Sequence, residues 1–111
     1  MSDAPAPGAS VIIPNWNGLA LLRPCLNSLA AQTLSPLDGS SEVIVVDNGS
    51  RDGSVDAVQA EYPWVRVLGL SENLGYAGGC NAGIAVAQGE ILVMLNNDTE
   101  AESDWLARLV A

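Results

Sequence analysis

The amino-acid sequence predicts an α/β fold: a Rossmann-like, mostly parallel four-stranded sheet with helices on both faces. The first observation is order, because four short apolar runs alternate with four segments of helical pattern along the whole chain. The second is that most of these runs are continuously apolar, as in strands that are covered on both faces. The third is length, since 111 residues suit one domain with a modest core.

The first strand and helix lie near the N-terminus. Residues 10–14 (SVIIP) predict a buried strand that Pro14 stops. Leucines then recur at helical spacing over residues 19–32, and Pro24 either kinks this helix or marks its true start. Residues 1–8 have the composition of a flexible tail, which leaves residues 9–111 as the domain.

The other elements follow in the same alternation. Expected are a strand over 42–47, a helix from the loop 48–54 to Tyr62, a strand over 65–70, a helix over 77–87, a strand over 91–95 and a helix starting near Ser103 or Asp104. The strand over 65–70 alternates apolar and polar residues, which places it nearer an edge. In the third helix we expect a buried stripe of Ala77, Cys80, Ile84 and Ala87, with Gly89 as C-cap.

Composition excludes several kinds of function. The net charge is −9, with four arginines and no histidine. The negative charge argues against a polynucleotide partner. The lack of histidine excludes both histidine-based catalysis and metal sites with histidine ligands. Any metal must then be held by oxygen ligands, which favours Mg²⁺ or Mn²⁺. Cys25 and Cys80 lie far apart at apolar helix positions and are expected to be reduced core residues.

The sequence shows no targeting or membrane-spanning segment. The N-terminus lacks a basic region followed by an apolar one, so we expect no signal peptide. The longest apolar runs are about five residues, short of the ~20 that span a bilayer. The expected location is therefore the cytoplasm.

Polar or glycine-rich loops follow all four strands: PNWNG, DNGSRDGS, SENLGYAGG and NNDTE. In a parallel sheet such loops meet at one edge, where ligands bind, and this favours a ligand site over four ordinary turns.

Asp98 offers a hard oxygen ligand for a metal, and Asp47 is either a cap or an acceptor for a nucleobase or ribose. The glycines at 75, 78, 79 and 83 do not fit a dinucleotide fingerprint. Gly79 and Gly83 instead suit tight packing of a helix on a sheet.

Four sequence blocks taken together, SVIIPNWNG, EVIVVDNGSRDGS, ENLGYAGGCNAGI and ILVMLNNDTE…DWL, resemble the donor-binding half of an inverting family-2 glycosyltransferase of the A-type fold. The resemblance runs from Ala9 to the end of the chain. It implies a set of nucleotide-sugar contacts: Pro14, Asn15, Asn17, Asp47, Ser50, Asp52, Asn73, Gly75, Asn81 and Asn97. Within this set, Asp47 matches the acid that recognises the base.

The resemblance also implies a divalent cation, Mn²⁺ or Mg²⁺, bound at Asp98 and Asn96. Asn96 stands where the family has a carboxylate, so the charge at the metal is lower. This variant resembles rhamnosyl- and galactofuranosyl-transferases. The implied donor is a UDP or dTDP sugar, and the implied acceptor is a glycan or a lipid-linked sugar of cell-wall or polysaccharide biosynthesis, reached at the inner face of the membrane by a full-length protein.

The family's general base is expected beyond Ala111, so the 111-residue chain alone is expected to transfer no sugar. Two other interpretations stay open: a non-catalytic nucleotide-binding or assembly module, and a doubly wound redox or nucleotide-sugar-modifying domain, which the glycine spacing disfavours. The sheet beyond residues 91–95 is left open, which predicts a homo-oligomer built on that C-terminal edge.

Overall fold

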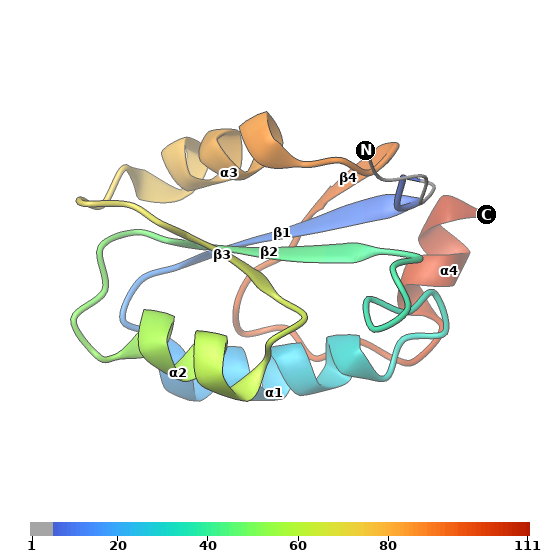
Figure 1. Ribbon diagram of the computed structural model, residues 1–111, viewed down its shortest axis with the longest axis horizontal. Helices are drawn as coiled ribbons and strands as arrows, with labels where there is room; N and C mark the ends of the chain where they lie inside the picture. Colours follow the sequence, from blue (N-terminus) through green and yellow to red (C-terminus); the bar gives the residue numbers. More distant parts are fainter. Residues whose placement is uncertain (1–5) are drawn as a thin grey trace.

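A computed structural model describes residues 6–111 and has the predicted architecture (Figure 1). The elements are β1 (Ala9–Asn15), α1 (Leu19–Ala30), β2 (Glu42–Asp47), α2 (Ser54–Glu61), β3 (Arg66–Gly69), α3 (Gly75–Val86), β4 (Ile91–Met94) and α4 (Trp105–Val110). The strands form one sheet in the order β3-β2-β1-β4, and every neighbouring pair is parallel. The expected edge position of β3 is confirmed.

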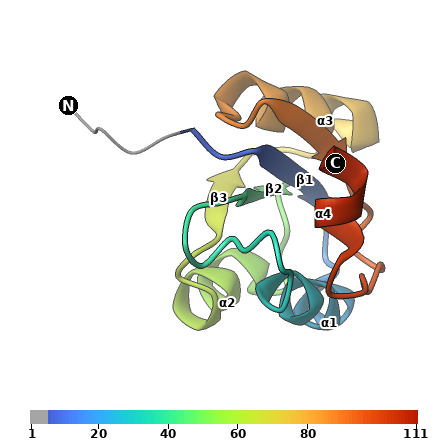
Figure 2. The same ribbon diagram turned by 90° about the vertical axis from the view of Figure 1, so that its right-hand side faces the viewer.

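Helices cover both faces of the sheet, with α1 and α2 on one side and α3 on the other (Figure 2). The side chains of β1 therefore divide between two cores. Val11 and Ile13 pack with Leu22 and Leu26 of α1, whereas Ile12 packs with Ile44 and Val46 beneath α3 in the second cluster. Successive residues of a strand face opposite sides, so a strand buried on both sides has a continuously apolar sequence.

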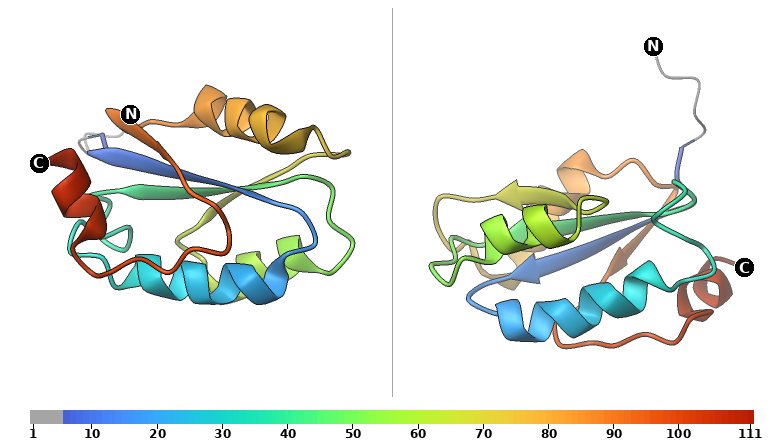
Figure 3. Two further views of the ribbon diagram at one scale, coloured as in Figure 1. Left: turned by 180° about the vertical axis from the view of Figure 1, so that it is seen from behind. Right: turned by 60° about the horizontal axis from the view of Figure 1, so that its bottom comes forward.

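The chain between β4 and α4 runs back along α1 to the amino end of the sheet (Figure 3). Gln32 fixes its far end, because its side chain donates to Glu102 O (2.6 Å) and accepts from Leu106 N (3.0 Å). Thr33 N also donates to Ser103 O (2.8 Å). As a result α4 lies at the opposite end of the molecule from the loops that follow β1, β2 and β3 (Figure 1).

The structure fixes the start of α1 and the end of α3. Helix α1 begins at Leu19 and continues through Pro24, so it does not start at the proline. Helix α3 ends with Ala87 as its C-cap, so the prediction of Gly89 is wrong. Gly89 instead lies against the start of β1, where a Cβ would be 2.5 Å from the carbonyl carbon of Ala9.

The predicted tail, residues 1–8, is described only in part. Residues 1–5 lie outside the described residues. Pro7 and Gly8 are bonded to the domain, with Gly8 N donating to Ser40 O (2.9 Å) and Ile91 N donating to Gly8 O (3.3 Å). Within the described part of the chain, no helix is long and apolar enough to cross a bilayer.

The buried stripe of α3 is made of smaller residues than the sequence pattern predicted. Gly79, Cys80 and Gly83 are buried, whereas Ala77 and Ile84 are exposed, so those two predictions are wrong. The reason is close approach: a Cβ on Gly83 would lie 2.5 Å from Ile12 Cγ2 and 3.1 Å from Val46 Cγ2. The prediction that these glycines serve helix–sheet packing is confirmed.

This contact yields a stability prediction. Alanine is normally about 1 kcal/mol more favourable than glycine inside a helix. At Gly83 the added methyl group overlaps Ile12 and Val46, so we expect Gly83→Ala to lower the free energy of unfolding by about 1–3 kcal/mol, as overpacking does. Chemical denaturation measures this, with exposed Ala85→Gly in the same helix as the propensity control. A more stable Gly83→Ala protein would show that α3 does not approach the sheet this closely.

Candidate functional site

The loops at the carboxyl ends of the strands surround a hollow of about 270 Å³. Its lining consists of Pro14, Asn15, Trp16, Asn48, Asn73, Gly75, Tyr76 and Asn97. These residues come from the loops or strand ends of all four strands, so the expected meeting of four polar loops is confirmed. Of the predicted nucleotide-sugar contacts, the hollow brings together Pro14, Asn15, Asn73, Gly75 and Asn97.

Asn15 lies at the centre of this arrangement. It is the last residue of β1 and is 1% exposed. Its Nδ2 donates to Asp47 Oδ1 (3.2 Å), and its Oδ1 accepts from Asn97 Nδ2 (3.0 Å). One buried amide therefore links the ends of β1 and β2 to the loop after β4.

Asp47 does not line the hollow. It is 2% exposed, and its Oδ2 accepts from Ser50 N (2.8 Å). The next residue, Asn48, lines the hollow instead, donating through Nδ2 to Gly75 O (3.3 Å) and accepting from Leu74 N (3.2 Å). Sequence reasoning missed Asn48. Successive residues of a strand face opposite sides, so the alternation along β2 predicts that Asp47 and Asn48 point in opposite directions. That signal could have identified Asn48.

Asn17, Ser50 and Asp52 lie beside the hollow and join two of its loops. Asn17 N donates to Ser50 Oγ (2.8 Å), and Arg51 N donates back to Asn17 Oδ1 (2.8 Å). Leu19 N donates to Asp52 Oδ2 (3.1 Å). Asn17 has φ +49°, a left-handed conformation that asparagine tolerates better than most residues. These three polar side chains thus hold the β1–α1 loop against the β2–α2 loop.

The predicted contacts between β3 and the end of α3 fall into two groups, those that line the hollow and one that does not. Asn73 accepts from Gly75 N through its Oδ1 (2.7 Å), which forms a tight turn with Gly75 at φ +77°. Both residues line the hollow. Asn81 is exposed further along the helix and is not part of the lining.

Two aromatic side chains border the hollow and are largely exposed, Trp16 at 57% and Tyr76 at 53%. Trp16 follows β1 into the loop, whereas the other two tryptophans, Trp64 and Trp105, pack against the larger core.

The residues predicted to bind a metal are exposed oxygen donors, Asn96 and Asp98. Residues 6–111 contain no group of three or more acidic or cysteine side chains placed to hold a metal ion. This donor set fits Mg²⁺ or Mn²⁺, which commonly take one or two carboxylates and complete their coordination with phosphate and water. Burial, with the negative charge of Asp98, raises the pKa of Cys25 to about 11, so the free thiol is protonated at neutral pH.

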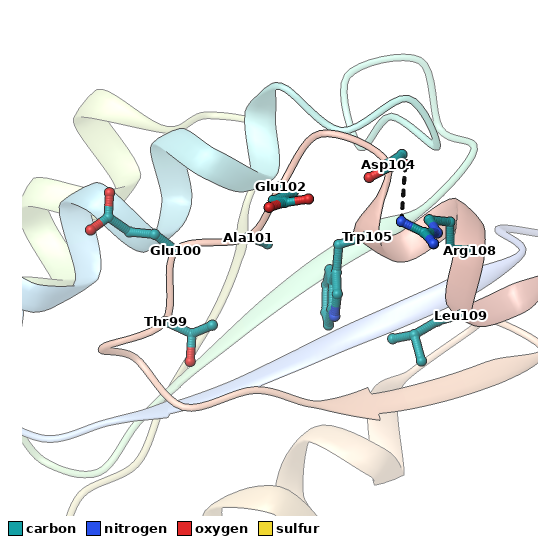
Figure 4. A pocket seen from close by; sticks show the side chains of 8 residues that line it. All are labelled: Thr99, Glu100, Ala101, Glu102, Asp104, Trp105, Arg108 and Leu109. Atoms are coloured by element: carbon teal, nitrogen blue, oxygen red, sulfur yellow. Dashed lines mark ion pairs between the residues drawn. The ribbon is translucent and has the colours of Figure 1, made fainter.

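A second, larger hollow of about 480 Å³ lies between α4 and the loop after β4 (Figure 4). Trp105 and Leu109 form its apolar wall, and Arg108 pairs with Asp104 (3.6 Å) at its border. It lies on the flank of the domain and shares none of its lining with the first hollow.

Comparison with known proteins agrees with the fold. The family model for glycosyl transferase family 2 matches residues 10–111. The chain belongs to glycosyltransferase family 2. It is 35% identical over 108 residues to glycosyltransferase AglE of Haloferax volcanii, matching 95% of this chain and 35% of that protein. It is 32% identical over 115 residues to undecaprenyl-phosphate 4-deoxy-4-formamido-L-arabinose transferase of Pseudomonas syringae pv. syringae, matching 99% of this chain and 34% of that one.

Solved structures give the same result. S. aureus TarS 1–349 in complex with UDP-GlcNAc superposes with a TM-score of 0.81 at 28% identity, over 91% of this chain and 29% of TarS. Mannosyltransferase PcManGT from Pyrobaculum calidifontis, in complex with GDP-Man and Mn²⁺, superposes with a TM-score of 0.71 at 30% identity, over 84% and 28%. The chain thus spans about a third of the length of these relatives.

The loop-joining role of Asp52 gives a pH-dependent prediction. Partial loss of water opposes its ionisation, but hydrogen bonds from the Ser54 hydroxyl and from the backbone N–H groups of Leu19 and Ser54 outweigh this, so the pKa of Asp52 lies below its ordinary value. A lowered carboxyl pKa adds stability that is complete above the ordinary value and is lost as pH falls through the folded-state pKa.

We therefore expect Asp52→Asn to lower the free energy of unfolding at pH 7 by about 1 kcal/mol, the typical net worth of a hydrogen bond. The difference from the unsubstituted protein should shrink below pH 4. Urea titrations at pH 7 and pH 3 measure this, with exposed Asp56→Asn as the matched control. A deficit that persists unchanged at pH 3 would contradict the assigned bonds.

Proposed function

We propose that this chain binds a nucleoside-diphosphate sugar in the hollow at the carboxyl ends of the strands, as the donor-binding part of an inverting glycosyltransferase. The observation that carries the proposal is the convergence of all four polar loops on one hollow beside Asp98. The structural neighbours solved with UDP, UDP-GlcNAc and GDP-Man support a nucleotide-sugar ligand. We expect a UDP or dTDP sugar.

In this proposal Pro14, Asn15, Asn73, Gly75 and Asn97 face the donor. Trp16 and Tyr76 cover its base or sugar ring, because exposed aromatic faces gain most from stacking on a flat ligand. Asp98, assisted by Asn96, holds a divalent cation against the diphosphate. The cation stabilises the charge that develops on the leaving group. The Mn²⁺ in the PcManGT complex supports this choice of cofactor.

The same proposal includes the sugar transfer that the full-length protein would carry out. We expect transfer with inversion to a glycan or lipid-linked acceptor, in the cytoplasm at the inner face of the membrane. The undecaprenyl-phosphate named for one relative supports such an acceptor. The alternative, a nucleotide-binding or assembly module without transfer, predicts the same ligand binding but no glycoside product.

The proposed metal site is tested by nucleotide binding with and without cation. The protein should bind UDP or dTDP more tightly with Mn²⁺ than without it. Asp98→Asn should remove this metal-dependent gain, by about tenfold or more in Kd, while leaving the fold unchanged, since a charge-assisted contact is worth about 1.5–3 kcal/mol. Calorimetry with UDP, dTDP, GDP and NAD measures it, and Asp56→Asn is the charge-matched control. Equal metal dependence in Asp98→Asn would disprove the metal assignment, and tighter NAD binding would disprove the donor class.

The open edge of the sheet supports the proposed homo-oligomer. Among residues 6–111, β4 pairs only with β1, and Ile91 and Leu92 are each 40% exposed. An unpaired edge with apolar side chains favours pairing with a second copy. We expect light scattering to show a dimer or larger species at high micromolar concentration, and Leu92→Lys to shift it toward monomer. A strictly monomeric chain would disprove assembly on β4.

A further inference from the structure

A line of hydrogen bonds crosses the candidate site from one strand end to the opposite loop. It begins at Asp47 at the end of β2, passes through Asn15 at the end of β1 and ends at Asn97 in the loop after β4. The distances are 3.2 Å from Asn15 Nδ2 to Asp47 Oδ1 and 3.0 Å from Asn97 Nδ2 to Asn15 Oδ1. Asn15 and Asn97 line the hollow, and Asp47 does not.

The carboxylate of Asp47 is occupied by the protein itself. One oxygen accepts from Asn15 and the other from Ser50 N (2.8 Å), and the residue is 2% exposed. An ionised carboxylate can only accept hydrogen bonds, so the Asn15 amide must present its N–H₂ group to Asp47. The Asn15 oxygen is thereby turned toward Asn97, which must in turn donate. A single charge thus fixes the orientation of two amides.

Gly18 gives an independent sign that this contact shapes the site. A Cβ on Gly18 would lie 2.8 Å from Asn15 Oδ1 and closer still to Asn97 Nδ2, the two atoms that form the second bond. Gly18 has φ −116°, which any residue can adopt, so its backbone does not require glycine. What requires glycine here is the room taken by the Asn15–Asn97 pair.

We propose that Asp47 is a positioning residue that acts through Asn15 to orient the side chain of Asn97 for the diphosphate and its cation. Asn15 holds one N–H of Asn97, which leaves the Asn97 carbonyl oxygen for the cation and the second N–H for an oxygen of the diphosphate. Asp47 does not contact the base in this scheme, and it affects every ligand that uses Asn97. The inference rests on the proposed function for its ligand, but its first test needs none.

The first test observes the side-chain amides directly. In ¹⁵N-labelled protein without ligand, Asp47→Asn should move or broaden the side-chain N–H₂ signals of Asn15 and Asn97, because an amide at position 47 no longer fixes the Asn15 orientation. Gly18→Ala should also change the Asn97 signal, because the added methyl group would displace the Asn15–Asn97 contact. It is the second variant, used if Asp47→Asn fails to fold. Asp56→Asn is the control with the same loss of charge. Unchanged Asn97 signals in the folded variants would overturn the proposal.

The second test separates positioning from base reading. The probe is Mg²⁺ with inorganic pyrophosphate, which has no base. If Asp47 positions Asn97, Asp47→Asn should weaken the binding of pyrophosphate and of UDP alike, by roughly tenfold or more, the effect of losing one hydrogen bond to a charged group. If Asp47 reads the base, UDP binding falls and pyrophosphate binding does not, which overturns the proposal. An unsubstituted protein that binds neither probe would refute the proposed function, and the amide signals would still decide the role of Asp47.

Discussion

The parallel register between β1 and β2 is the constraint on which the rest of the site depends. It places Asn15 directly opposite Asp47, the last pair of the ladder, and the ladder continues from Asn48 N to Asn15 O (2.8 Å). The register is fixed by apolar pairs further back, such as Ile12 opposite Ile44 under α3. A slip of one residue would turn each of these side chains to the other face, so the packing of two cores determines where two polar side chains meet.

Much of the fold could be predicted from the sequence because apolar periodicity depends on burial alone. The runs ending at Pro14 and Asp47 predicted strands that are covered on both faces, which they are, whereas β4 is an edge strand with Ile91 and Leu92 exposed. The polar residues after these runs had to share one edge. What could not be predicted was how far apart two elements lie. Gly83 lies against Ile12, so the buried stripe of α3 includes, beside Cys80, two glycines that no apolar pattern reveals. Ala77 and Ile84, which fit that pattern better, are exposed.

The same limit applies to the site. The sequence brings the right loops together, but polar residues can contact a ligand or one another, and composition does not distinguish the two. Asn17, Ser50 and Asp52 use their polar atoms between loops, and Asp47 is enclosed behind Asn48. The lining that remains is mostly neutral amides and aromatic rings, in a chain of net charge −9. Such a surface supplies shape and hydrogen bonds, so a cation suits it as the source of positive charge for a diphosphate.

The segment between β4 and α4 is fixed at both ends. Asn97 is bonded to Asn15 at the carboxyl end of the sheet, and Leu106 is bonded to Gln32 near the amino end. The stretch between them runs the depth of the domain, and one residue of extended chain covers at most about 3.6 Å. A deletion within residues 99–102 would shorten the connection between these two fixed ends, so we expect deletions to be rarer here in related sequences than the loop's irregular structure suggests.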